Sequence, residues 1–257
     1  MKNIGVIPAR MESSRFPGKP LKNICGIPMI AHCWIRSKMS KLDEVYIATC
    51  NEEISSYAKS LGARVIMTGN HHERASDRVA EAVSIIEKDS GETLETVTLI
   101  QGDEPFVNAQ MINLALDTLM AEKNASVVNL MSVIDNEPGS QDPNEVKVVT
   151  GIDNYALYFS RARLPDLSKT DVKFDAYRQI CVIPFTRNFL FEYSDLEPTP
   201  LEIIESVDML RVLEHGHKIK MAEVYELSIS VDTPDDLAAA EALMINDILY
   251  DQYKNDV

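Results

Sequence analysis

Short apolar runs alternate with amphipathic stretches along the first half of the chain. The apolar runs, which are typical of buried strands, are 4–7, 44–49, 64–68, 95–100 and 126–133. The amphipathic stretches, which are typical of helices, are 29–37, 51–61, 79–88 and 108–123. This alternation predicts an α/β fold with a mostly parallel sheet and right-handed crossovers. Ser76 or Asp77 is the expected cap of the helix at 79–88.

The alternation changes between about residue 145 and residue 200 and then resumes. Here the pattern predicts two antiparallel strands around a turn at Asp153 and Asn154, then another strand and a short helix. Beyond them we expect an amphipathic helix that Gly216 ends, a strand, and a final helix from about Asp235. The predicted strands are 145–150, 156–160, 178–185 and 219–224, and the predicted helices before the final one are 189–193 and 201–214. We therefore predict a single domain over residues 1–257 that carries an antiparallel insertion at about 145–200.

Composition narrows the class of protein. The 257 residues include 40 acidic and 25 basic side chains, which gives a formal charge of −15. Such a surface argues against binding to nucleic acid or to anionic membranes. No apolar run approaches the ~20 residues of a membrane-spanning helix, and no signal peptide is recognisable. The four cysteines form no metal-binding or disulfide pattern, so we expect reduced, mostly buried thiols and a cytoplasmic location.

The first apolar run opens into a cationic loop. In residues 4–21, IGVIPARMESSRFPGKPL, the strand is followed by Arg10, Arg15 and Lys19, with small residues between them. A loop of this kind at a strand end presents backbone N–H groups and positive charge, as phosphate sites in α/β proteins do. Because the chain as a whole is acidic, we interpret the loop as a polyphosphate site rather than as a solvated basic turn.

Two acidic residues follow later apolar segments. Asp103 lies in QGDEP, directly after the strand at 95–100. Asp232 lies in VDTPDD, where we expect it at the end of a late strand, just before a helix capped by Thr233 with Pro234 in its first turn. Asp103 could either cap the next helix or bind Mg²⁺ beside a polyphosphate. Two strand-end carboxylates that converge would hold metal at a reacting phosphorus.

Other polar side chains have simpler explanations. For Arg78, Lys147 and Arg161, taken singly, an exposed surface charge is the expected role. His32 lies on an apolar helix face and is expected in the core or at its rim, whereas the loop pair His71–His72 remains a candidate donor to a phosphate or a base. The chain contains no signature of serine hydrolases, zinc proteases, P-loop NTPases or dinucleotide oxidoreductases.

Taken together, the motifs are similar to those of one known family. IPARMESSRFPGKPL, QGDEP, NEVKVV with YALYFSRARLP, PLEIIESVDMLRVL and VDTPDDL resemble, in that order, the 3-deoxy-manno-octulosonate (Kdo) cytidylyltransferases, also called CMP-Kdo synthetases. The first motif fits this family better than the related acylneuraminate cytidylyltransferases. The resemblance, from about residue 4 to residue 240, implies a nucleotidyltransferase-like three-layer α/β sandwich of Rossmann type, a homodimer formed through the inserted region, and Mg²⁺ as cofactor. It also implies that CTP and a 2-keto-3-deoxy sugar acid give a CMP-sugar and pyrophosphate, a reaction of lipopolysaccharide biosynthesis.

The resemblance also implies roles for individual residues. Arg10 and Lys19 would hold the triphosphate. Arg15, Gln101 and Arg161 would face the sugar acid, and a guanidinium suits its carboxylate. Asp103 and Asp232 would hold Mg²⁺. The catalytic set is therefore Arg15, Lys19, Asp103 and Asp232, and the substrate-binding set is Pro8, Ala9, Arg10, Arg74, Ser76, Arg78, Gln101, Arg161, Gln179 and Asp208.

The chain departs from the family pattern in several segments. Residues 74–78 are RASDR, where the family has Ser-Gly-Thr-Asp/Glu-Arg, and residues 179–183 are QICVI, where it has His-x-Gly-Ile-Tyr. Asp208 and Met209 stand in place of Glu-Gln, and Cys50 in place of the Asp of an ATD segment. Because most of these changes fall on the acceptor side, we hypothesise that the acceptor is a relative of Kdo or another anionic acceptor such as a phosphonate.

A different class of function is also open. The chain could be a catalytically silent nucleotide-binding paralogue that acts as a regulator or scaffold. The four residues that argue against this are Arg10, Lys19, Asp103 and Asp232. A silent protein has no need to keep the carboxylates expected to bind metal.

Overall fold

The chain forms two compact units in a computed structural model that describes residues 2–13, 15–134, 142, 144–166, 175–226 and 228–255. The first unit contains Met1–Asn113 and Leu227–Val257, and the second contains Leu114–Glu226. The predicted turn-rich segment 135–143 and the later part of the predicted loop 161–173 lie mostly outside the described residues. Of the described helices, none has both the length and the apolar character that crossing a bilayer requires.

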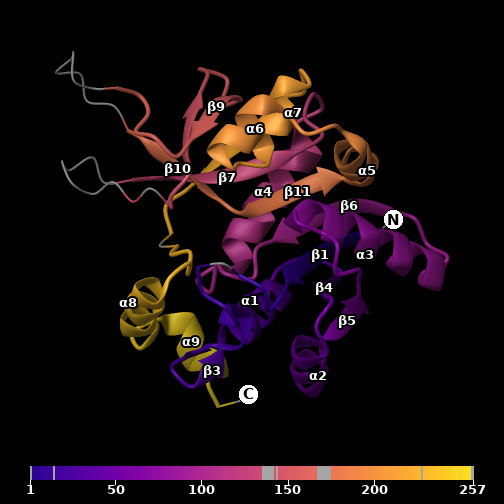
Figure 1. Ribbon diagram of the computed structural model, residues 1–257, viewed down its shortest axis with the longest axis vertical. Coiled ribbons are helices and arrows are strands. Elements are labelled where there is room, and N and C mark those ends of the chain that lie inside the picture. Colours follow the sequence, from indigo (N-terminus) through magenta and orange to yellow (C-terminus); the bar gives the residue numbers. More distant parts are fainter. Residues whose placement is uncertain are drawn as a thin grey trace. The chain divides into compact units, whose positions relative to one another are not determined.

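A parallel sheet forms the centre of the first unit (Figure 1). Its strands are β1 (Lys2–Ala9), β4 (Glu44–Thr49), β5 (Arg64–Met67) and β6 (Leu94–Ile100), with neighbours in the order β6-β1-β4-β5. Each of these pairings is parallel, as the sequence pattern predicts. The chain moves outward from β1 to β4 and β5 and then returns to the other side of β1 to form β6. Ligands of open α/β sheets bind where the strand order reverses in this way, at the carboxyl ends of the strands.

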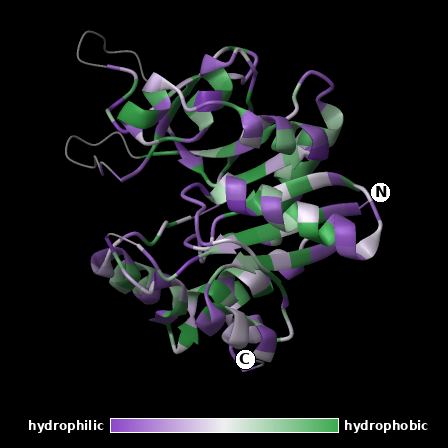
Figure 2. Cartoon of the chain, turned by 45° about the vertical axis from the view of Figure 1, so that its right-hand side comes forward, coloured by the Kyte–Doolittle hydropathy of each residue, from purple (hydrophilic) through white to green (hydrophobic). Residues whose placement is uncertain are grey.

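Helices α1 (Met29–Lys38), α2 (Glu52–Ser60) and α3 (Ala75–Ser90) pack against this sheet through buried apolar residues. Hydrophobic residues are concentrated in the strands and in parts of the helices beside them (Figure 2). Helices α8 (Pro234–Met244) and α9 (Ile248–Tyr253) pack instead beside α1, where α8 meets Met29 and α9 meets Ala31 in the core. The 3₁₀ helix η1 (Lys19–Leu21) and the short strands β2 (Asn23–Ile24) and β3 (Ile27–Pro28) lead into α1. The starts and ends of α1 and α2 agree with the prediction to within one residue.

A buried polar network joins α9 to α1. His32 Nδ1 lies 2.6 Å from the hydroxyl of Tyr253, and Arg36 Nε donates to the same hydroxyl at 3.3 Å. Arg36 also forms an ion pair of 2.5 Å with Asp247. Burial lowers the pKa of His32 to about 4, so its imidazole is neutral at physiological pH. His32 is therefore a core residue, as predicted.

The second unit contains a mixed sheet with neighbours in the order β12-β7-β10-β8-β9. Its strands are β7 (Val128–Val133), β8 (Lys147–Thr150), β9 (Ala156–Ser160), β10 (Tyr177–Ile180) and β12 (Lys220–Val224). The hairpin of β8 and β9 is confirmed, and Asn154 has a left-handed φ of 57° in its turn. Helices α5 (Arg187–Asp195), α6 (Pro200–Glu205) and α7 (Met209–Glu214) belong to this unit, and α4 (Ala109–Ala121) contains the boundary between the units.

Two elements predicted as continuous are interrupted. The predicted strand 178–185 is β10 and β11 (Val182–Thr186), with Cys181 between them. The predicted helix 201–214 is α6 and α7, because Ser206 adopts a left-handed conformation with a φ of 52°. A residue in that conformation ends an α-helix. The apolar periodicity continues through Ser206, so the break leaves no signal in the pattern.

Three further expectations are wrong. Helix α3 begins at Ala75, so Ser76 and Asp77 lie in its first turn and do not cap it. The segment 228–232 is not a strand; its contact with residue 103 is a single backbone bond of 2.9 Å from Val231 N–H to the carbonyl of Asp103. All four cysteines are free thiols, but Cys33 alone among them is buried.

Candidate active site

The loop after β1 turns back on itself at the carboxyl edge of the sheet. Pro8 and Ala9 are buried and end β1, where they pair with β4. Gly18 has a φ of 73°, a conformation that costs glycine little. Its N–H donates to the carbonyl of Met11 at 2.9 Å and closes the loop. Lys19 follows directly, as the first residue of η1.

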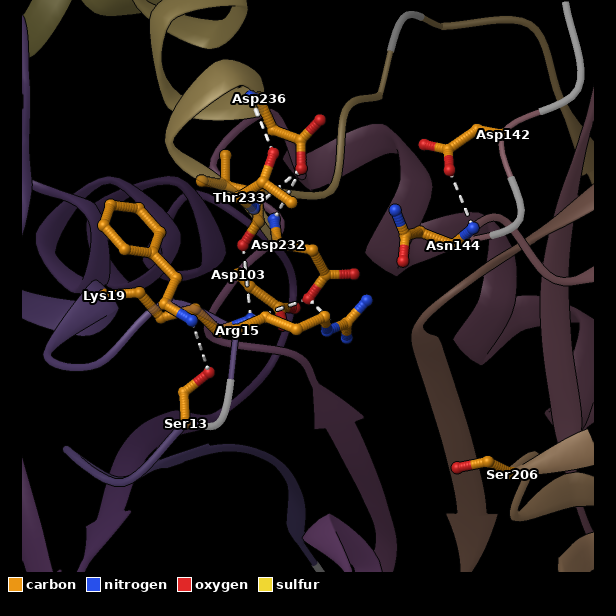
Figure 3. A network of polar contacts seen from close by, with 12 residues as sticks. Ser13, Arg15, Lys19, Asp103, Asp142, Asn144, Ser206, Asp232, Thr233 and Asp236 are labelled. Carbon is orange, nitrogen blue, oxygen red and sulfur yellow. Dashed lines mark hydrogen bonds and ion pairs between the residues drawn. The ribbon is translucent and has the colours of Figure 1, made fainter.

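Lys19 contacts both of the predicted carboxylates (Figure 3). Its Nζ lies 2.6 Å from Oδ2 of Asp103 and 3.0 Å from Oδ1 of Asp232, and it donates to the carbonyl of Val231 at 3.2 Å. The side chains of Lys19, Asp103 and Asp232 are only 15%, 21% and 15% exposed. Arg15 donates to the same Oδ1 of Asp232 at 2.9 Å. The complete predicted catalytic set therefore lies together, next to the switch point between β1 and β6.

The carboxylates determine the charge state of Lys19. Burial by itself would lower the pKa of its ammonium, but the nearby charges of Asp103 and Asp232 outweigh burial and raise that pKa above its usual value. Lys19 is therefore cationic at neutral pH and pairs with both carboxylates, while Asp232 also pairs with Arg15.

Asp103 owes its position to a close approach between two strand ends. A Cβ on Gly102 would lie 3.2 Å from the carbonyl oxygen of Pro8, which is tighter than most real contacts. Glycine thus lets the chain leaving β6 pass beside the end of β1. The cap of α4 is Asn108, whose Oδ1 accepts from the N–H of Met111 at 3.0 Å. Asp103 is therefore not needed for capping.

Asp232 is positioned by the start of α8. The carboxylate of Asp236 accepts from the N–H of Asp232 at 3.0 Å and from that of Thr233 at 2.8 Å. The hydroxyl of Thr233 accepts in return from the N–H of Asp236, which completes a capping box with Pro234 in the first turn. The predicted cap is confirmed, and Asp236 is a supporting residue that we did not predict, although its spacing from Thr233 is a recognised signal.

An apolar cluster lies close in sequence to every member of the charged group. Phe16 adjoins Arg15, Val231 adjoins Asp232, and Phe106 follows Asp103 by three residues. The buried members of the cluster are Phe16, Ile24, Met29, Phe106, Val231, Ala240 and Met244. Because close-packed side chains shift little, this cluster fixes the backbone that carries the charges.

The first turn of α3 contains buried polar atoms without protein partners. Arg78 donates to Thr68 Oγ1 at 2.5 Å and to the carbonyl of Gly69 at 3.1 Å, which leaves its NH2 group buried and unbonded among the described residues. The hydroxyl of Ser76 is also buried and unbonded. Arg78 is 3% exposed, so the expected surface charge is wrong. Buried donors without partners are costly, and a bound ligand would satisfy them.

Neighbouring predicted residues have partners within the first unit. Arg74 forms a two-bond ion pair with Asp77, at 2.9 and 2.5 Å. Arg10 is exposed and donates to the carbonyl of His72 at 3.3 Å. The imidazole of His72 lies 2.5 Å from Glu81 and is not free to act as a phosphate donor in this arrangement. Gln101 directly follows β6 and is half-buried.

In the second unit, the side chains of Lys147 and Arg161 each donate hydrogen bonds to three backbone carbonyls. Lys147 Nζ donates to the carbonyls of Asp142, Glu145 and Arg161 at 2.6, 2.9 and 3.2 Å. The guanidinium of Arg161 donates to three more carbonyls, those of Asn144, Glu205 and Ser206, at 3.0, 2.9 and 3.1 Å. Lys147 is 2% exposed, so its predicted surface position is wrong.

Other predicted acceptor-side residues are also in the second unit. Gln179 lies on β10, and its Nε2 donates to Oδ1 of Asn129 at 2.5 Å. Asp208 precedes α7, and its carbonyl accepts from the hydroxyl of Tyr193 at 2.9 Å. Glu205, which we did not predict, accepts from the N–H of Arg161 and the hydroxyl of Ser160. These contacts join α6 to residues about 45 positions earlier in the chain, so the local sequence pattern does not predict them.

Comparison with known proteins identifies the family. The sequence profile of the cytidylyltransferase family matches residues 4–219. The chain is 39% identical over 237 residues to 3-deoxy-manno-octulosonate cytidylyltransferase from Fusobacterium nucleatum, with 92% of this chain and 94% of that protein covered. This chain belongs to the Kdo cytidylyltransferase family. The mitochondrial family member of Arabidopsis thaliana is 38% identical, over 94% of this chain and 82% of that protein.

Solved structures support the same family and fold. A CMP:2-keto-3-deoxy-manno-octonic acid synthetase in complex with CTP matches with a TM-score of 0.84 and 32% identity, over 96% of this chain and 99% of that one. A cytidylyltransferase from Leptospira borgpetersenii matches with a TM-score of 0.64 and 15% identity, over 100% of this chain and 95% of that one, and shows the fold alone. The predicted nucleotidyltransferase-like fold is confirmed.

Proposed function

We propose that this chain is a Kdo cytidylyltransferase, which transfers CMP from CTP to a 2-keto-3-deoxy sugar acid and releases pyrophosphate. The observation that carries the proposal is the contact of Lys19 with Asp103 and Asp232 next to the switch point of the sheet. Family membership specifies the nucleotide and the acceptor, because the relatives at 37–40% identity have this activity in their names.

The proposed reaction needs positioning and charge neutralisation rather than a covalent intermediate. The anomeric hydroxyl oxygen of the sugar acid bonds to the α-phosphorus of CTP and loses its proton. The bond from the α-phosphorus to the bridging oxygen of the β-phosphate breaks, and pyrophosphate leaves with the electron pair. Arg10 and Lys19 are the proposed triphosphate ligands, and Arg15, whose side chain is 46% exposed, is a proposed ligand of the sugar acid.

Asp103 and Asp232 are the proposed ligands of Mg²⁺. Both reach the ammonium of Lys19 to within 3.0 Å, so their oxygens already converge on one cation. Oxygen donors of this kind suit Mg²⁺, which often takes one or two carboxylates together with phosphate oxygens. When bound, the ion supplies positive charge to the phosphates and acidity to the attacking hydroxyl. Among the described residues, no cluster of three or more metal-binding side chains offers an alternative site.

For the nucleotide, we propose a contribution from the first turn of α3. The buried, unbonded NH2 group of Arg78 and hydroxyl of Ser76 support this assignment, because a ligand would complete their hydrogen bonds. For the acceptor, Gln101, Arg161, Gln179 and Asp208 remain proposed ligands. Three carbonyl bonds hold the Arg161 guanidinium in place, and they use three of its five N–H donors.

A Kdo relative is the second candidate acceptor. The changes at Gln179 and Ile183 favour it, because they stand where the family has a His and a Tyr that would face the sugar. We also propose a homodimer formed through the hairpin region, supported by the exposure of Leu157 on the edge strand β9, which is 65% exposed. A cytoplasmic site of action completes the proposal and agrees with the four free thiols.

Pyrophosphate release from purified full-length protein tests this function. The assay combines each of CTP, UTP, ATP and GTP with Mg²⁺ and a panel of sugar acids that includes Kdo. We expect release with CTP and Kdo or a relative, and none after chelation of the metal. If only a phosphonate is turned over, the acceptor is a phosphonate and not a sugar acid. If CTP binds but no acceptor is turned over, the result favours the catalytically silent paralogue. Light scattering on the same sample tests the dimer.

A further inference from the structure

A buried asparagine fixes the orientation of Gln179. Asn129 on β7 is fully buried, and its Nδ2 donates to two backbone carbonyls, those of Ile180 at 2.7 Å and Leu130 at 3.0 Å. The opposite orientation of this amide would turn Oδ1 toward both carbonyl oxygens, acceptor against acceptor. The Oδ1 of Asn129 must therefore point to its remaining neighbour, the side chain of Gln179.

This arrangement determines which end of the Gln179 amide is available. Because Asn129 offers an oxygen, Gln179 must donate to it, which it does through Nε2 at 2.5 Å. The Oε1 of Gln179 is left as an acceptor, and no described residue donates a hydrogen bond to it. The side chain is half-buried, and Oε1 is not among the buried unbonded atoms, so the oxygen is accessible from outside the sheet.

A second acceptor lies in the same row of this sheet face. Met131 pairs with Gln179 of β10 on one side and with Glu223 of β12 on the other. Residues paired across strands share a face, and three adjacent strands place the outer two about 10 Å apart. Tyr177, two residues from Gln179, donates its hydroxyl to a carboxylate oxygen of Glu223 at 3.4 Å, and that carboxylate can accept further hydrogen bonds. Both polar ends of this row thus accept hydrogen bonds.

We propose that Gln179 is a specificity-determining residue that recognises a hydrogen-bond donor, a hydroxyl or an amino group, on the sugar acid through its Oε1. Asn129 is the positioning residue that prevents the amide from turning. The proposal rests on the proposed function, since it concerns the acceptor of that reaction. It specifies the chemistry of recognition: the acceptor must donate at this position, and the carboxylate at Glu223 favours an amino group over a purely accepting substituent.

Analogues that separate donation from acceptance test this inference. In a series of Kdo analogues, each hydroxyl except the reacting anomeric one is replaced in turn by fluorine, which cannot donate, or by an amino group, which can. We expect that at one position fluorine lowers kcat/KM about tenfold, as for loss of one hydrogen bond, while the amino group is tolerated. Gln179→Met, which keeps the length of the side chain, should abolish this discrimination and leave the KM for CTP unchanged.

Two further variants separate recognition from folding. Asn129→Ser keeps a donor for one carbonyl but frees the Gln179 amide to turn, so the difference between fluorine and amino analogues should shrink although Gln179 is present. Ser132→Ala removes a hydroxyl bonded to Arg178, on the opposite face of the same strands, and should preserve the discrimination. Turnover with unchanged discrimination in Gln179→Met overturns the inference alone. A wild-type protein that uses no sugar acid overturns both the inference and the proposed function.

Discussion

Lys19 and Lys147 are both largely buried, one in each unit, but their partners differ in charge. Lys19 meets two carboxylates, and their charges raise its pKa against the effect of burial. Lys147 donates to three backbone carbonyls, and burial lowers its pKa because neutral oxygens compensate desolvation only in part. The same side chain is therefore held in two electrostatically opposite ways.

This difference in partners indicates that Lys19 is an exchangeable cation and that Lys147 is a structural one. If the ammonium of Lys19 moves, a metal ion can take its place between the two carboxylates, and the ammonium can pair with a triphosphate instead. The carbonyls at Lys147 belong to the backbone of 142–145 and to Arg161, so removal of that ammonium releases chain segments. A cation paired with carboxylates at a switch point, such as Lys19, can therefore take part in substrate binding and catalysis. A cation bonded to backbone carbonyls, such as Lys147, stabilises the fold.

The largest expected effect on activity comes from Asp103, a partner of the exchangeable lysine. Asp103→Ala should lower the rate of pyrophosphate release at least about a thousandfold, because one proposed metal ligand and one partner of Lys19 are lost. Thermal unfolding should change little, since Asp103 does not cap α4. Asp89→Ala, at an exposed position near the end of α3, is the matched control and should keep full activity. A variant of Asp103 that retains activity would remove this residue from the mechanism.

Substitution of Lys19 tests whether its carboxylates are exchangeable. Lys19→Met should reduce kcat about a hundredfold through loss of phosphate binding in the transition state. It should also tighten the binding of Mn²⁺, used as a probe for Mg²⁺ in the absence of CTP, because Asp103 and Asp232 both lose the ammonium that they contact, and only Asp232 keeps a second cation, Arg15. Electron paramagnetic resonance of free Mn²⁺ measures this affinity. Lys22→Met, three residues further along the same loop, is exposed and should change neither quantity. Weaker Mn²⁺ binding in Lys19→Met would contradict the exchange.

The structural lysine should respond in the opposite way. Lys147→Met should lower the free energy of unfolding by about 2 kcal/mol, because three partly buried carbonyls lose their donor. The affinity for CTP should stay unchanged. Urea unfolding and calorimetric titration provide the two measurements, with Lys123→Met, at an exposed position in the turn after α4, as control. A stable Lys147→Met protein with impaired CTP binding would reverse the roles of the two lysines.

The contrast between the two lysines also explains what the sequence could predict. Strand ends follow from apolar runs, and the carboxyl ends of parallel strands share an edge, so the meeting of Lys19 with Asp103 was predictable from local pattern. Lys147 takes its partners from chain segments brought together by the hairpin and the loop before it, so its burial leaves no local trace. The break at Ser206 is similar, since the donation of Arg161 to its carbonyl depends on distant packing.

The smallest expected effect is a pair of opposite pH dependences at alkaline pH. The folded pKa of Lys147 lies below its usual value of 10.5, so the unfolded chain binds more protons between these two values, and this group's contribution to stability rises with pH there. The folded pKa of Lys19 lies above 10.5, so its contribution is complete below that pH and falls as pH increases further. Guanidinium unfolding of the wild type minus each Lys→Met variant, between about pH 8 and 11, isolates the two slopes. Slopes of equal sign would mean that carboxylates and carbonyls hold these ammonium groups in the same way.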